Sequence, residues 1–102
     1  MSAEPGDIVR IAKQSEAGKN EEFTACVVKT GNNISVCDIT VSQDDDNEAI
    51  PIIDVGIEDL VVTGFIHPSR LLAVDPGNIQ HIYIKLNNET RDKVIAAASL
   101  PL

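Results

Sequence analysis

The stretch that decides the fold is FTACVVKTGNNISVCDITV, residues 23–41. It contains two apolar, β-prone segments, 23–30 and 34–41, joined by Gly31-Asn32-Asn33. Glycine and asparagine tolerate the positive φ angles that a tight hairpin turn needs. We therefore predict that the two segments form an antiparallel pair of strands, with the first of them central in a β sheet.

Short strands are also predicted on both sides of this hairpin. Residues 8–13 alternate between apolar and polar side chains, and the polar segment 14–22 is expected to be an exposed loop. Pro51 places segment 50–53 at a sheet edge, where a missing N–H is tolerated. Further on we expect a turn at 56–60, an irregular connector at 64–69, a turn at 75–78, and strands at 61–63, 70–74 and 81–86.

The chain is predicted to end in a helix over residues 90–99. Asn87 is suited to cap it, Glu89 adds a favourable charge at its positive end, and Val94, Ile95 and Ala98 form an apolar stripe. Pro101 lies beyond that segment. About seven short strands followed by one helix predict a mainly β fold, a small, partly open barrel with a C-terminal helix packed on it.

Length and composition fit one globular domain covering residues 1–102. Hydrophobic residues make up 43% of the chain and charged residues 24%, an ordinary globular balance. No apolar run approaches the roughly 20 residues of a membrane span, and the polar N-terminus is unlike a secretory signal. Cys26 and Cys37 lie in apolar segments. We expect buried free thiols and a cytoplasmic protein, although neighbouring strands would also allow a disulfide.

The net charge of −8 is concentrated in residues 1–63, which carry thirteen acidic and four basic side chains. Such acidity argues against a nucleic-acid partner, although a local groove can be basic on an acidic protein. The acidic run 44–48 lacks the glycine and spaced glutamate of a calcium loop, so a solvated loop is expected. No metal-binding or cofactor-binding motif is present in the sequence.

The order of the segments resembles the MazF/PemK family of toxin–antitoxin toxins over nearly the whole chain. Residues 6–9 match the family's Gly-Asp-Ile-Val strand, and residues 23–28 take the place of its Arg-Pro-Ala-small-Val-Val strand. An Ile-Thr segment follows at 38–42, a Gly-Leu-x-x-x-Ser-like stretch at 64–69, and a short strand, a cap, a glutamate and a helix from Ile84 onward.

The resemblance implies an SH3-like small β-barrel of the CcdB/MazF type. It also implies a homodimeric growth inhibitor, neutralised by a cognate antitoxin protein, that cleaves single-stranded mRNA with no cofactor and no metal. Thr40 corresponds to the family's active-site threonine. The arginine that binds the scissile phosphate in the family is absent, because Phe23-Thr24 stands where the family has Arg-Pro.

Candidate site residues follow from this resemblance and from the chemistry of the side chains. The candidate catalytic residues are Thr40, His67 and Arg70, and the candidate substrate-binding residues are Lys13, Lys19, Ser42 and Ser69. Histidine exchanges protons near neutral pH, which suits a general acid or base. Interpretations without a functional role also remain open for these residues. Thr40 is then an ordinary threonine at a strand end, His67 a surface residue on a connector, and Lys13 and Lys19 solvated loop residues.

Three functions remain open at this point. The first is an endoribonuclease toxin. The second is a non-catalytic protein-binding member of the same fold, like the CcdB-type toxins that bind DNA gyrase, which the missing arginine and the net charge of −8 favour. The third is a degenerate member or an adaptor that only binds a protein partner.

Overall fold

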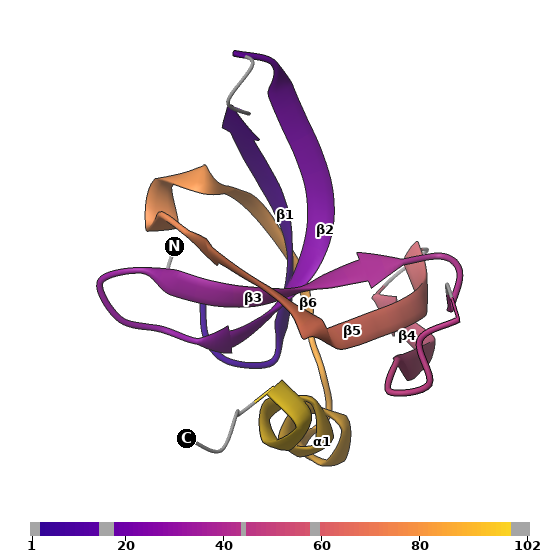
Figure 1. The fold of residues 1–102 in the computed structure, drawn as a ribbon. Coiled ribbons are helices and arrows are strands. Elements are labelled where there is room, and N and C mark those ends of the chain that lie inside the picture. Colours follow the sequence, from indigo (N-terminus) through magenta and orange to yellow (C-terminus); the bar gives the residue numbers. More distant parts are fainter. Residues whose placement is uncertain (1–2, 15–17, 44, 58–59, 99–102) are drawn as a thin grey trace.

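The computed structural model describes residues 3–14, 18–43, 45–57 and 60–98, which form one curled antiparallel sheet and a helix (Figure 1). The six strands lie in the order β4-β5-β3-β2-β1-β6 and make a half-barrel. Their bounds are β1 (Asp7–Gln14), β2 (Asn20–Lys29), β3 (Ile34–Thr40), β4 (Ile50–Ile57), β5 (Leu60–Val74) and β6 (Ile79–Lys85). A short 3-10 helix, η1 (Pro76–Asn78), precedes β6, and α1 (Asn88–Ala98) follows it.

The central hairpin and the helix cap form as predicted. Strands β2 and β3 pair antiparallel, with Cys26 opposite Cys37. Strand β4, which contains Pro51, lies at one edge of the sheet. At the start of α1, the N–H of Thr90 donates to Asn87 Oδ1 at 2.8 Å. The local sequence signals at these places are therefore confirmed.

The irregular connector predicted at 64–69 was wrong, because these residues continue the strands predicted at 61–63 and 70–74 as the single long strand β5. Gly64 allows β5 to lie close to β3, since a Cβ at this position would come within 2.8 Å of the Thr40 carbonyl oxygen. Pro68 lies where the β3–β5 register shifts from Cys37–Leu71 to Asp38–His67. A missing N–H is tolerated at such a bulge. Gly64 and Pro68 are thus accommodated inside one strand, and the sheet formed by the described residues has six strands.

Smaller differences concern the strand ends. The segment 14–22 was predicted to be a loop, but β1 extends to Gln14 and pairs with Asn20 at the start of β2. Strand β4 continues to Ile57, into the predicted turn at 56–60. Residues 58, 59 and 101 lie outside the described residues. Cross-strand pairing extends these ends beyond what the polar local sequence indicated.

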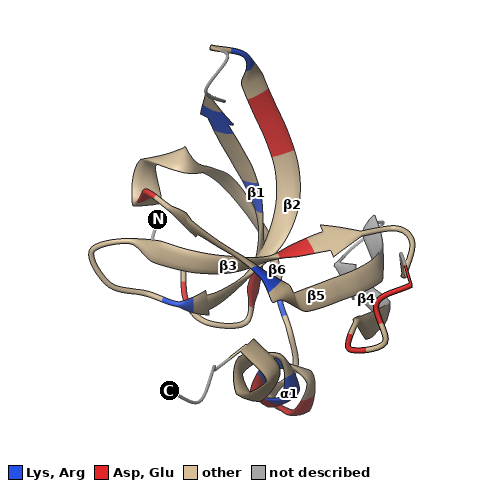
Figure 2. Ribbon diagram, in the orientation of Figure 1, with Lys and Arg blue, Asp and Glu red and all other residues tan. Residues whose placement is uncertain are grey.

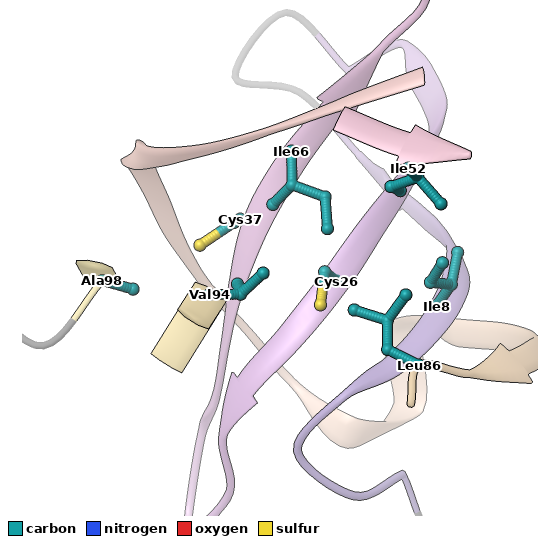
Figure 3. Packing of buried hydrophobic residues seen from close by; sticks show 8 residues of the cluster. All are labelled: Ile8, Cys26, Cys37, Ile52, Ile66, Leu86, Val94 and Ala98. Carbon is teal, nitrogen blue, oxygen red and sulfur yellow. The ribbon is translucent and has the colours of Figure 1, made fainter. Parts of the chain in front are cut away.

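The apolar residues form one cluster on each face of the sheet, because neighbouring side chains along a strand point to opposite sides. On one face, α1 contributes Val94 and Ala98, which pack with residues of the central strands (Figure 3). Figure 3 labels this cluster: Ile8, Cys26, Cys37, Ile52, Ile66, Leu86, Val94 and Ala98. The other cluster comprises Val9, Ile11, Ala25, Val27, Ile34, Val36 and Val74.

Both cysteines are free thiols in the cluster beneath α1. Burial raises the pKa of the Cys26 thiol to about 12 and that of Cys37 to about 11. The prediction of buried free thiols is confirmed, although the two residues are partners across β2 and β3. No helix of the described residues is long and apolar enough to cross a membrane.

Candidate functional site

A fully buried histidine lies at the centre of the candidate site. His67, on β5, has none of its surface exposed. Its Nδ1 lies 2.7 Å from Asp46 Oδ2, and its Nε2 lies 2.7 Å from Thr40 Oγ1. Both ring nitrogens therefore have a hydrogen-bond partner, as a buried polar side chain requires. The three side chains form a continuous line from the acidic loop to the end of β3.

The sheet register places Thr40 and His67 together. Asp38 on β3 is opposite His67 on β5, and Thr40 is opposite Phe65. Residues two apart on a strand share a face, so Thr40 lies on the same side as Asp38 and adjoins His67 diagonally. The end of β3 thus brings a hydroxyl to the imidazole ring.

The loop after β3 brings Asp46 to the other side of that ring. The N–H of Asp46 donates to the Gln43 carbonyl oxygen at 3.0 Å, and Gln43 Nε2 donates to the Asp46 carbonyl oxygen at 3.1 Å. The N–H of Glu48 donates to Asp46 Oδ1 at 3.0 Å, which leaves Oδ2 for His67. Both carboxylate oxygens of Asp46 are therefore engaged, and its side chain is only 15% exposed.

These contacts constrain the protons of the site. Thr40 Oγ1 lies 2.5 Å from the Ser42 carbonyl oxygen, which can only accept a hydrogen bond. The Thr40 hydroxyl donates to that carbonyl oxygen. Nε2 and Nδ1 of His67 each lie at hydrogen-bonding distance from a partner, Thr40 Oγ1 and the Asp46 carboxylate. The imidazole ring therefore links the hydroxyl to the carboxylate.

The charges around Asp46 agree with an ionised carboxylate. The hydrogen bond from His67 holds the pKa of Asp46 below its usual value, and the Glu48 N–H and the charge of Arg70 act in the same direction. Arg70 Nη1 lies 3.8 Å from Asp38 Oδ2. One guanidinium group therefore acts on two carboxylates that flank the histidine.

An open groove of about 320 Å³ lies next along the same strands, and Asp38, the register partner of His67, is part of its lining. Lys13 and Arg70 bring two cations to it, and Glu21 and Asp38 bring two carboxylates. Its apolar lining comes from Phe23, Val36, Leu71 and Leu72. Figure 2 shows the basic residues at separate positions along the strands and on α1. The groove is therefore mixed in charge and partly apolar.

The structure brings together some of the predicted site residues and leaves others apart. Thr40 bonds His67 directly, and Ser42 takes part through its main-chain carbonyl. Ser69 is exposed on β5. Lys19 is exposed just before β2 and is not among the residues that line the groove.

The alternative interpretation of His67 as a surface residue on a connector was wrong, because the ring is buried within β5. His81, by contrast, is exposed on β6, and its ring packs edge-on against Tyr83 with centroids 4.9 Å apart. Only one of the two histidines is therefore part of the candidate site.

Sequence reasoning missed two carboxylates of the site. Asp38 had a local signal, because it precedes Thr40 by two residues on a strand and must share its face. Asp46 had no such local signal, because the whole acidic run 44–48 was interpreted as a solvated loop. In the described residues, no group of three or more His, Cys, Asp or Glu side chains is arranged to hold a metal ion.

Comparison with known proteins gives a structural match only. No protein-family model matches the sequence, and no curated protein matches it. Among solved structures, the chain is similar to an endoribonuclease in complex with its cognate antitoxin from a mycobacterial species, with a TM-score of 0.71 and 99% of each chain covered. The two chains share one fold.

Sequence identity to the mycobacterial endoribonuclease is 13%. An identity this low supports the architecture and says nothing about individual site residues. The fold expected from the resemblance to MazF/PemK toxins, mainly β with a C-terminal helix, is therefore confirmed. The function of this chain has to be argued from its own side chains.

Proposed function

We propose that this chain is the toxin of a toxin–antitoxin pair and that it cleaves single-stranded RNA without a metal ion. The observation that carries the proposal is the line Thr40–His67–Asp46 beside the groove that contains Arg70. The similar fold of an endoribonuclease bound to its antitoxin supports the same proposal.

The reaction proposed is attack of a ribose 2′-OH on the adjacent phosphorus. The P–O5′ bond breaks, the 2′ proton passes to a base, and the leaving 5′ oxygen is protonated. Negative charge increases on the phosphoryl oxygens in the transition state, where fixed donors and cations are most effective. The Thr40 hydroxyl supplies such a donor when its proton turns from the Ser42 carbonyl oxygen to a phosphoryl oxygen. His67 Nε2, 2.7 Å from Oγ1, holds that hydroxyl in position.

Arg70 is proposed to replace the arginine that the family carries at the position of Phe23. Phe23 and Arg70 line the same groove, so a guanidinium reaches the same space from β5 instead of β2. Asp38, 3.8 Å from Arg70, is the carboxylate placed to accept the 2′ proton. Asp46 is a positioning residue, because it acts on the substrate only through His67.

The decisive experiment compares RNA cleavage by wild-type protein and by Thr40→Ala in the presence of EDTA. We expect wild type to cleave and Thr40→Ala to lose about a hundredfold in rate, as when one transition-state donor is removed. Thr24→Ala is the matched control, since Thr24 lies on β2 beside Cys26 on the helix-covered side. Absence of metal-independent cleavage, or full activity of Thr40→Ala, would contradict the proposal.

The antitoxin partner is tested in cells. Expression of the chain should arrest growth with loss of transcripts, and a small protein encoded beside it should restore growth. Phe23 at the family's arginine position favours a second candidate function, a toxin that binds a protein target without cutting RNA. Growth arrest with intact transcripts would support that second function and reject the first.

A further inference from the structure

The groove beside the site combines an aromatic ring with exposed aliphatic side chains. Phe23 is half-buried in its wall, and Leu71 and Leu72 are 39% and 36% exposed. They are among the few large hydrophobic residues that the described part of the chain exposes to this degree. Proteins that bind single-stranded nucleic acid use aromatic rings and apolar surfaces of this kind to stack unpaired bases.

The charged groups of the groove come in two kinds with different uses. Lys13 and Arg70 are cations that attract a phosphate, and Glu21 lies directly across from Lys13 in the β1–β2 pairing. An ionised carboxylate only accepts hydrogen bonds. It therefore favours a base edge that carries adjacent N–H groups, and it repels an edge dominated by carbonyl oxygens.

Among the bases, guanine fits such a carboxylate best. Its N1–H and N2 amino group lie side by side and match the two oxygens of one carboxylate, whereas uracil presents a single N–H between two carbonyls. Asp38 is held near Arg70, so Glu21 is the carboxylate placed for the base edge. The ring of Phe23 lies two residues from Glu21 on the same face of β2.

The position of the groove connects this binding to the proposed reaction. Asp38 lines the groove and is the register partner of His67, and the charge of Arg70 acts on Asp46. A nucleotide whose phosphate lies at Arg70 would therefore be next to Asp38, two residues before Thr40 on the same face of β3. Base binding on β2 and bond cleavage at the end of β3 would take place on neighbouring strands of the sheet.

We propose that this groove is a nucleobase subsite that holds a guanine of single-stranded RNA against Phe23, with its N1–H and amino edge on Glu21 and its phosphate toward Arg70. The substrate class rests on the proposed function. The subsite itself rests on the groove. At the position where the resemblance to the family implies a phosphate-binding arginine, this chain has Phe23, whose ring is proposed to stack on the base.

The test uses short oligonucleotides that are 2′-O-methylated throughout, so that they cannot be cleaved. Five versions differ at one central position, which carries G, A, C, U or no base, and their affinities are measured by fluorescence anisotropy at fixed salt. We expect G to bind about tenfold or more tightly than U, as for one bidentate base contact. We expect the abasic version to bind more weakly than all the others.

Two variants assign the contacts. Phe23→Leu should weaken binding of every base-bearing oligonucleotide by about tenfold, as loss of stacking does, and leave the abasic version unchanged. Glu21→Gln should remove the preference for G over U. Glu22→Gln is the matched control, because Glu22 is the next residue on β2, points to the opposite side and pairs with Arg10. If Phe23→Leu does not fold, Phe23→Tyr and the abasic comparison with wild type keep the test decisive.

Equal affinity for all five oligonucleotides, or a Phe23→Leu effect as large on the abasic version, would overturn the subsite. Preference for A or C would overturn the assignment of guanine. Base-selective binding by a protein that cleaves no RNA would support the subsite and reject the proposed function. Cleavage of RNA without any base selectivity would support the proposed function and reject the subsite.

Discussion

The two faces of strands β2 and β3 differ in kind, although the same backbone carries both. The face covered by α1, which we call the closed face, carries the buried Cys26 and Cys37, which pack with Ile66 of β5 and with the helix. The opposite face, which we call the open face, is apolar over most of its length and becomes polar toward the end of β3. There Asp38 and Thr40 continue the alternation of Ile34 and Val36.

The difference shows where this small fold has room for chemistry. On the closed face a polar group would lose its solvent beneath the helix, so only residues that pack are suitable. On the open face the cluster ends before the sheet does, and the last residues of β3 meet a loop instead of a helix. The candidate site and the groove both lie in that region. The largest effects on stability are therefore expected on the closed face and the largest effects on activity on the open face.

The strongest test of the closed face is Ile8→Ala. Ile8 is completely buried beneath α1, and removing a buried isoleucine side chain typically costs about 2–5 kcal/mol of unfolding free energy. Urea denaturation measures the loss. Val41→Ala is the control, because Val41 is 90% exposed and the change should stay within about 0.5 kcal/mol. A similar small loss for Ile8→Ala would contradict the assignment of the core.

The next test breaks the link between the acidic loop and the open face. The pKa of Asp46 is lowered in the folded protein by the His67 hydrogen bond, so ionised Asp46 stabilises the fold above the ordinary Asp pKa of about 3.9. That stabilisation is lost as the pH falls through the folded-state pKa. We expect Asp46→Asn to be less stable than wild type at pH 7 and to lose less stability between pH 5 and pH 2.

Urea denaturation across this pH range measures the effect, and Asp45→Asn in the same loop is the control. Parallel pH profiles for wild type and Asp46→Asn would show that the Asp46–His67 contact does not form in solution. In RNA cleavage, Asp46→Asn should lower the rate and change its pH profile, because it acts through His67. A purely structural role would leave the pH profile unchanged.

A smaller effect is expected where the helix begins. Asn87→Ala removes the acceptor for the Thr90 N–H and should cost about 1 kcal/mol of unfolding free energy. Asn88→Ala is the control, since Asn88 is the first residue of α1 and alanine favours a helix. Thermal unfolding distinguishes the two variants. An equal effect of both would mean that Asn87 does not cap the helix.

The smallest effect is expected from thiol reagents on native protein. Burial raises the pKa of Cys26 to about 12 and that of Cys37 to about 11, so both stay protonated at pH 8. The thiolate is the reactive form. We expect almost no modification by an alkylating reagent over an hour in buffer, and complete modification of both thiols in denaturing urea, measured by mass spectrometry. Rapid labelling of the native protein would show that the closed face opens.

Sequence patterns predicted those parts of the fold whose causes are local. The Gly31-Asn32-Asn33 turn, the strands beside it and the Asn87 cap depend on residues close in the chain. Strand β5 was divided wrongly because Gly64 and Pro68 usually end strands, and the reason they do not lies on β3. The candidate site was predicted in part. Thr40 and His67 were predicted as site residues. Asp46 was not, because it is 21 positions from His67 in the sequence and contacts it only through the folded loop.

The register shift at Pro68 separates two parts of the open face. On β3 the partner positions Cys37 and Asp38 are adjacent, whereas on β5 their partners Leu71 and His67 are four positions apart. Pro68, Ser69 and Arg70 thus act as a spacer between the histidine and the groove wall. Lengthening the strand there would move Arg70 and the leucines while His67 could stay paired with Asp38. The shape of this groove wall is thus set separately from the pairing that holds the histidine.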